Sequence, residues 1–219
     1  MTMHRGTAAL LIASLALTCS CAATKVDYAP YRSHMPRSIL VLPPLNESTN
    51  VNAPYVYLST VSRPLAECGY YVFPVAVIDV FMKDNGLPTS EEMHSVSLNK
   101  IKQVIGADAV LYVTIEDWGQ KYQVLSSNTV VKARARLVDA STGAELWTGA
   151  ERLVQGSGGG GNDLISMLIA ALIHQVIAAM TDPAHEVSRQ ATNLMIFNSN
   201  TGLLFGPHHS QYDSDPRGR

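Results

Sequence analysis

The stretch Thr129–Val138 reads TVVKARARLV and alternates apolar with basic side chains. Apolar residues fall at every second position, namely Val131, Ala133, Ala135 and Leu137. Successive side chains of a strand point to opposite faces of its sheet, so this pattern predicts an antiparallel strand with one buried and one solvated face. The fold is organised around this strand.

The neighbouring segments extend the sheet in both directions. Ala109–Trp118 is rich in β-branched residues and predicts a long strand, and Val124–Leu125 is expected to end a second one. Ser126–Asn128 is polar and predicts a turn. The sequence Asp139–Gly143, DASTG, predicts the turn that leads into a further strand over 144–154. Three or four antiparallel strands are therefore expected between residues 109 and 154.

The first half of the chain predicts strands that alternate with helices. Short apolar runs predict strands at Ser38–Leu42 and Tyr70–Phe73, and the polar run Leu45–Ala53 predicts a loop. Helices are expected over four segments, the first of which should be kinked or split at Pro64: Tyr55–Cys68, Val75–Met82, a segment that begins with a Thr89–Glu92 capping box, and Leu98–Ile105. This order is typical of an α/β layer.

The C-terminal third contains an uncharged run, Leu164–Met180, after a glycine-rich hinge at 156–161. A helix that is apolar nearly all round is buried, self-associated or in a membrane, and all three alternatives stay open here. If it is an interface, the expected contacts are Leu164, Met167, Leu168, Ala171 and Leu172. A polar helix is expected over Pro183–Phe197.

The predicted fold class is therefore α/β (α+β). We expect a mixed sheet with an antiparallel second half, covered by helices, plus the long apolar C-terminal helix. One such domain is expected over residues 38–205, and the polar residues 206–219 are expected to form a disordered tail.

The N-terminus reads as an export signal. Arg5 precedes an uncharged run over 8–16, which is shorter than the roughly 20 residues that a membrane-spanning helix needs. The run ends in Leu17-Thr-Cys-Ser-Cys21, which resembles the lipobox of bacterial lipoproteins. It predicts a signal peptide over 1–20, cleavage between Ser20 and Cys21, and lipid attachment to the Cys21 thiol. Cys19 is a rival acceptor, and a plain cleaved signal is the alternative.

Residues 21–37 are then expected to form the lipidated N-terminus and a tether, because two prolines and scattered charges show no period. Ala22 stands where an aspartate would resemble the retention signal of the inner membrane. We therefore expect a lipid anchor on the periplasmic face of the outer membrane.

Composition favours a globular domain and argues against several classes of function. The chain is 47% apolar with a formal net charge of −2, so it can bury a core and has no basic excess for a nucleic acid. Cleavage and lipidation would leave Cys68 as a lone thiol, expected to be a buried structural residue.

We also find no residues arranged for catalysis. Glu116 and Asp117 are adjacent on a predicted strand and should point to opposite faces, so they form no carboxylate pair. His208 and His209 have no further ligands at metal-binding spacing, and the glycine run lacks a following lysine. We expect no enzyme, no cofactor and no metal. The basic row Lys132, Arg134 and Arg136 is either a solvated sheet face or a contact for an anionic partner or lipid headgroups.

Three stretches carry a resemblance to a known family: Ser38–Pro44, Gly106–Leu111 and Val138–Trp147. Over about residues 25–205 the chain resembles the lipoproteins of a Gram-negative family of unknown function found in Neisseria and its relatives. The Asp139-to-Trp147 hairpin is also similar to that of the curli-secretion lipoprotein CsgG and of the amino-terminal α/β domain of the translocation protein TolB. The resemblance implies an outer-membrane lipoprotein of an assembly or export system, without catalytic residues.

The leading functional hypothesis is a non-enzymatic interaction module that serves envelope assembly or transport. Its expected partners are the membrane, through the lipid, and either further copies of itself or envelope assembly proteins. The alternative is a periplasmic protein that binds a small ligand or assists transport, with a closed pocket lined by Tyr112, Trp118 or Trp147. An envelope hydrolase is the third hypothesis.

Overall fold

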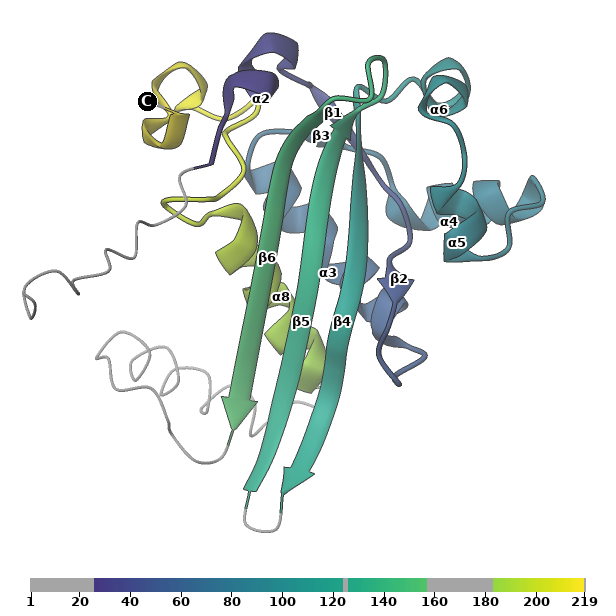
Figure 1. The fold of residues 1–219 in the computed structure, drawn as a ribbon, viewed down its shortest axis with the longest axis vertical. Helices are drawn as coiled ribbons and strands as arrows, with labels where there is room; N and C mark the ends of the chain where they lie inside the picture. The colour runs from purple at the N-terminus through teal and green to yellow at the C-terminus, as the bar shows by residue number, and fades with distance from the viewer. Residues whose placement is uncertain (1–25, 124–125, 157–182, 219) are drawn as a thin grey trace, which may run out of the picture.

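The computed structural model describes residues 26–123, 126–156 and 183–218. These residues form a mixed sheet of six strands with helices on both of its faces (Figure 1). The strands are β1 (Ser38–Val41), β2 (Leu45–Asn46), β3 (Tyr71–Val72), β4 (Ala109–Gln123), β5 (Ser126–Asp139) and β6 (Glu145–Gly156). The mixed α/β fold predicted from the sequence is confirmed.

The sheet has the order β3-β1-β4-β5-β6. Strand β1 lies parallel to both β3 and β4, whereas β4, β5 and β6 form an antiparallel meander. The apolar run at Ser38–Val41 is thus an interior strand, as its composition predicts. Leu45–Asn46, expected in a loop, is instead a short strand, because its backbone pairs with β4 beyond the end of β1.

Two helices, α3 (Ala53–Glu67) and α8 (Pro183–Ile196), cover one face of the sheet (Figure 1). Their core includes the apolar residues of β5 and the Trp147 indole, whose N–H donates to the Thr201 carbonyl at 2.8 Å. We call this side the closed face. Of the two expected effects of Pro64, a kink or a split, the split is wrong, because α3 continues through this residue. Burial of Val61 and Leu65 against the sheet holds the helix on both sides of the proline.

The other face is covered only near β1 and β4, by α4 (Val75–Asp84), α5 (Ser90–His94) and α6 (Leu98–Val104). The predicted capping box begins α5: the Thr89 hydroxyl accepts from the Glu92 N–H, and the Glu92 carboxylate accepts from the Thr89 N–H at 3.0 Å. These helices bury a second core around Leu40, Leu42 and Val110.

The two hairpin turns of the meander differ from each other. The Asp139–Gly143 turn is confirmed, since the Asp139 carboxylate accepts from the Ser141 and Thr142 N–H groups and Gly143 has a positive φ of 76°. The turn expected at Ser126–Asn128 is wrong, because β5 already begins at Ser126 and pairs with Gln123 of β4. Its polar residues belong to the distal end of a long ribbon.

Residues 26–37, predicted to be part of a tether, pack on the domain instead. They contain α2 (Ala29–His34), with Pro30 in its first turn, and bury the rings of Tyr28 and Tyr31. The Tyr28 hydroxyl donates to the Gly202 carbonyl at 2.5 Å. The sequence of residues 26–37 has no periodic pattern from which this packing could be predicted, because the packing depends on two aromatic side chains, Tyr28 and Tyr31.

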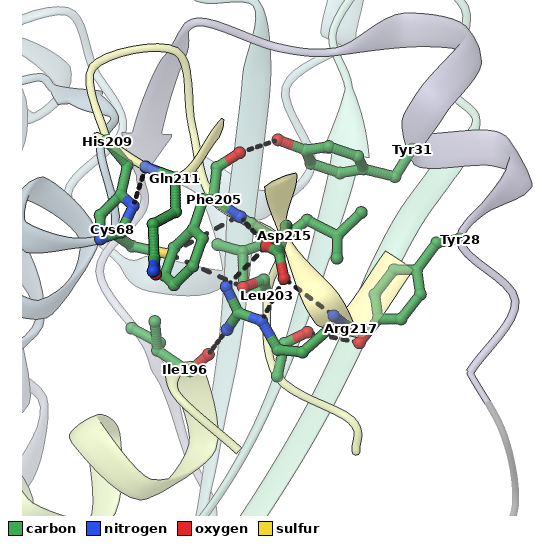
Figure 2. A network of polar contacts seen from close by, with 12 residues as sticks. Tyr28, Tyr31, Cys68, Ile196, Leu203, Phe205, His209, Gln211, Asp215 and Arg217 are labelled. Atoms are coloured by element: carbon green, nitrogen blue, oxygen red, sulfur yellow. Dashed lines mark hydrogen bonds and ion pairs between the residues drawn. The ribbon is translucent and has the colours of Figure 1, made fainter. Parts of the chain in front are cut away.

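The prediction of a disordered tail over 206–219 is also wrong for residues 206–218. Two 3₁₀ turns, η2 (Tyr212–Ser214) and η3 (Pro216–Gly218), fold this segment back onto the domain (Figure 2). The polar composition of the segment does not prevent its burial, because Asp215 and Arg217 form an ion pair there. Their side chains are only 7% and 5% exposed. The domain therefore extends beyond the predicted bounds of 38–205 at both ends.

The long apolar helix predicted over Leu164–Met180 lies outside the described residues, as does the glycine run after Gly156, which ends β6. The predicted helix over Pro183–Phe197 is confirmed as α8. Within the described ranges, no helix is long and apolar enough to cross a membrane.

Candidate functional site

Helix α4 carries an apolar surface that its own fold does not cover. Ile78 and Met82 face the core, whereas Val77, Val80 and Phe81 are 62%, 56% and 40% exposed. These three lie at i, i+3 and i+4 and so share one side of the helix. Val104 at the end of α6 is also exposed, and we call these four side chains the α4 stripe.

A groove continues the α4 stripe between α4 and α6. It encloses about 280 Å³ and is mostly apolar, with Phe81, Leu87, Val96 and Val104 among its lining residues. Contiguous exposed apolar surface on a soluble domain marks a contact site. The sequence predicts the helix but not this exposure. The exposed apolar side could have been predicted from the composition of VAVIDVFM, which has more apolar residues than one buried helix face requires.

The second candidate surface is the uncovered side of β5 and β6. Lys132, Arg134 and Arg136 of β5 are exposed there, on the side opposite the buried Val131 and Ala133, as the alternating sequence predicts. Arg152 of β6 stands directly across from Lys132 and is exposed as well. We call Lys132, Arg134, Arg136 and Arg152, with the glutamates that pair with them, the open basic face.

A β-bulge places two neighbouring carboxylates, Glu116 and Asp117, on the side of the open basic face. The register of β4 against β5 shifts between Ile115 and Asp117, so Ile115 and Trp118 are both buried. The expectation that Glu116 and Asp117 alternate strictly between faces is therefore wrong at this point, because a bulge adds one residue to the strand.

Glu116 pairs with two neighbouring cations of β5. Its carboxylate is 2.5 Å from the Lys132 ammonium and also pairs with the Arg134 guanidinium, and its side chain is 15% exposed. The hydrogen bond from Lys132, together with the charge of Arg134, holds the pKa of Glu116 below its ordinary value. Arg136 is held more weakly, at 3.8 Å from Glu145. Glu116 thus neutralises only part of this face.

A wide depression borders the open basic face. It measures about 830 Å³, and Leu45, His94, Tyr112, Arg134 and Arg136 are among its lining residues. The Tyr112 ring contacts His94 edge to face and lies 5.4 Å from the Arg136 guanidinium. Burial lowers the pKa of His94, although its hydrogen bond to the Pro43 carbonyl opposes that shift.

This depression differs from the closed pocket that the small-ligand hypothesis predicts. Tyr112 lines it, but Trp118 and Trp147 are each 2% exposed and belong to the core of the closed face. The depression is broadly open to solvent. Two of the three predicted pocket residues therefore stabilise the fold.

A buried polar network closes the domain near its C-terminus (Figure 2). The Arg217 guanidinium donates to both Asp215 oxygens and stacks on the Phe205 ring at 4.0 Å. Asp215 also accepts from the Phe205 N–H at 2.7 Å. Beside them, burial raises the pKa of the Cys68 thiol to about 12, which agrees with the predicted structural cysteine.

Several predicted site residues lie outside the described ranges. They are the cleavage pair Ser20 and Cys21, the latter also the lipid acceptor, and the expected interface residues Leu164, Met167, Leu168, Ala171 and Leu172. Across residues 26–123, 126–156 and 183–218, no three His, Cys, Asp or Glu side chains gather where they could hold a metal ion.

Comparison with known proteins identifies relatives over most of the chain. Residues 26–208 match the family model described as "Putative lipoprotein GNA1162-like". A protein of Neisseria meningitidis serogroup B described as "Putative lipoprotein NMB1124/NMB1162" is 43% identical over 182 residues, which are 83% of this chain and 85% of that protein.

One solved structure agrees with this relationship. The crystal structure of lipoprotein GNA1162 from Neisseria meningitidis is 44% identical, with a TM-score of 0.55, and covers 66% of this chain and all of that one. The PelC dodecamer from Paraburkholderia phytofirmans is more distant, at 21% identity and a TM-score of 0.43 over 64% of this chain and 86% of that one.

The family match covers residues 26–208, which include α2 and the start of the C-terminal segment. A lipoprotein is held at a membrane by covalent lipid, which indicates an anchored protein of the cell envelope. Both the match and the 43% identity show that this chain belongs to the GNA1162-like family of lipoproteins.

Proposed function

We propose that the chain is an outer-membrane lipoprotein, anchored through Cys21, that acts on the periplasmic side as a non-enzymatic interaction module in envelope assembly or transport. Family membership and the lipobox-like sequence before Cys21 support the anchor. The α4 stripe supports the interaction module and is the observation that carries it. The partner is either a second copy or another envelope protein.

The α4 stripe has the features of a docking surface for a protein. Fully burying one large apolar side chain contributes about 1.5–3 kcal/mol, so several such residues in contact with a partner supply substantial affinity. The groove beside Phe81 gives that partner a recess for an apolar side chain of its own. Leu164, Met167, Leu168, Ala171 and Leu172 remain predicted contacts of the uncharged segment.

A photo-reactive cross-linker at Val80 tests this surface in intact cells. We expect it to capture a discrete partner, and we expect Phe81→Asp to reduce that capture at least tenfold, because a buried carboxylate at an apolar contact is costly. Val51 is 79% exposed on a loop and supplies the matched position: a cross-linker there should capture nothing. Equal capture from both positions would contradict the proposed docking surface.

The anchor is tested by Cys21→Ser. This variant should incorporate no labelled lipid and should move from the membrane fraction to the soluble periplasmic fraction. Cys19→Ser is the matched control and should behave like the natural chain. Continued lipid labelling of Cys21→Ser would make Cys19 the acceptor.

A small-ligand function is the second candidate, and the depression beside Tyr112 favours it. An aromatic ring between His94 and Arg136 suits a ligand with an anionic group and a flat apolar part. Native mass spectrometry of protein purified from its own cells should then show a bound mass that Tyr112→Ala loses. A spectrum of the unliganded chain alone would count against this candidate.

A further inference from the structure

The open basic face contains an uncompensated charge. Lys132 and Arg152 stand directly opposite each other on adjacent strands, an arrangement of like charges that destabilises a sheet. Glu116 pairs with Lys132, but in the described residues Arg152 has no ion-pair partner. Among the described residues, four cations thus face three carboxylates on this side, those of Glu116, Glu145 and Asp117, the last in register with Lys132, although the whole chain is formally −2. An external anion would relieve this repulsion.

The first residues that the structure describes lie close to this face. Val26 packs partly buried against the core and lines the same depression as Arg134 and Arg136. Just after it, α2 lies beside β6, at the edge of the sheet (Figure 1). Val26, the first residue that the structure describes, is therefore at the rim of the basic surface.

The chain between the lipid and this rim is short. Four residues separate Cys21 from Val26, and a fully extended chain spans at most about 3.6 Å for each of the five steps between them, or about 18 Å in all. The docking of α2 shortens the expected tether, because residues 26–37 cannot extend while Tyr28 and Tyr31 remain buried. The lipid thus holds the basic surface within reach of the headgroups.

We propose that the open basic face rests on anionic phospholipid headgroups of the membrane that holds the Cys21 lipid. The inference builds on the anchor of the proposed function and adds an orientation to it. Arg134, Arg136 and Arg152 contact headgroup phosphates, while the closed face points away from the membrane. Paired Arg–phosphate hydrogen bonds suit this contact.

Vesicle binding of the released Cys21→Ser chain tests the charge complementarity. We expect binding to vesicles that contain phosphatidylglycerol, and no binding to phosphatidylcholine alone. Two arginines near an anionic surface contribute about a 30-fold change in affinity, so R136Q with R152Q should weaken binding by about that factor. R63Q with R189Q removes the same charge from α3 and α8, the helices of the closed face, and should leave binding unchanged. Equal losses in both pairs would overturn the proposal.

The orientation is tested with the lipidated full chain in vesicles. A fluorophore on Thr148→Cys reports the open basic face, since Thr148 is exposed and opposite Arg136, and one on Ser59→Cys reports the outer side of α3. Cys68 is fully buried and stays unlabelled in the folded protein. With phosphatidylglycerol, a water-soluble quencher should reach position 59 but not 148.

The outcomes separate this inference from the proposed anchor. A chain that floats with the vesicles but is quenched equally at both positions keeps its anchor and overturns the orientation. A chain that does not float overturns the anchor, and the orientation with it.

Discussion

The two faces of strand β5 have the same backbone and opposite surroundings. On the closed face, Val131, Ala133 and Leu137 lie beneath α3 and α8 with almost no exposure. On the open basic face, Lys132, Arg134 and Arg136 alternate with them and stay in solvent. A residue's side of the strand, more than its place in the chain, thus decides whether it stabilises the fold or meets a partner. Adjacent residues are therefore matched controls for each other.

The largest expected effect comes from Trp147→Ala. The indole is 2% exposed and fills the core of the closed face, so its removal should lower the free energy of unfolding by about 3–5 kcal/mol. Its neighbour Thr148 lies exposed on the other side, and Thr148→Ala should change that free energy by less than about 0.5 kcal/mol. Urea unfolding measures both variants. Similar losses would remove the distinction between the faces.

The next effect belongs to the buried ion pair beside the closed face. Arg217→Ala leaves the Asp215 carboxylate buried without its partner and should lower the free energy of unfolding by about 3 kcal/mol. Arg63→Ala breaks an exposed helical pair with Glu67 and should cost at most about 0.5 kcal/mol. A loss below 1 kcal/mol for Arg217→Ala would show that the C-terminal segment is not held by this pair.

The same pair predicts a pH dependence. Burial alone would raise the pKa of Asp215, but hydrogen bonds from the Arg217 guanidinium and the Phe205 N–H outweigh it and hold that pKa below its ordinary value. The stabilisation is then complete above the unfolded pKa of about 3.9 and is lost as the pH falls through the lower folded pKa. Acid unfolding curves should show this loss in the natural chain and not in Arg217→Ala.

The smallest effect lies on the open basic face, at Glu116→Gln. Removing this carboxylate deprives Lys132 and Arg134 of their ion pairs with Glu116, which should cost about 0.5–1 kcal/mol at low salt. Salt screens exposed charges, so the loss should shrink in 0.5 M NaCl. Urea midpoints at both salt concentrations measure this. A loss that salt does not change would indicate that Glu116 acts through packing.

Much of the fold could be predicted from local pattern. The alternation of apolar and basic residues predicted β5, and β-branched runs predicted β1 and β4. The Thr89–Glu92 spacing predicted the capped start of α5. These signals are local, because side-chain periodicity and capping depend on residues a few positions apart. The bulge at Ile115–Asp117 could not be predicted from the sequence, since only the pairing with β5 reveals the extra residue.

The candidate surfaces were less predictable. The basic row on β5 could be seen in the sequence, but Arg152 joins it only through the register of β6. The α4 stripe required knowledge of which side of the helix the sheet covers. Contacts across the fold decide these points.

By itself, the sequence determined the class of fold and the alternation of β5, and it predicts an export signal over residues 1–20. Only the tertiary structure decided that residues 26–37 and 206–218 belong to the domain. Their order comes from contacts over 100 residues apart in the chain, such as Tyr28 with Gly202, and from a buried ion pair. A polar segment without periodicity has no local signal of order, because its stability comes from partners supplied by distant segments.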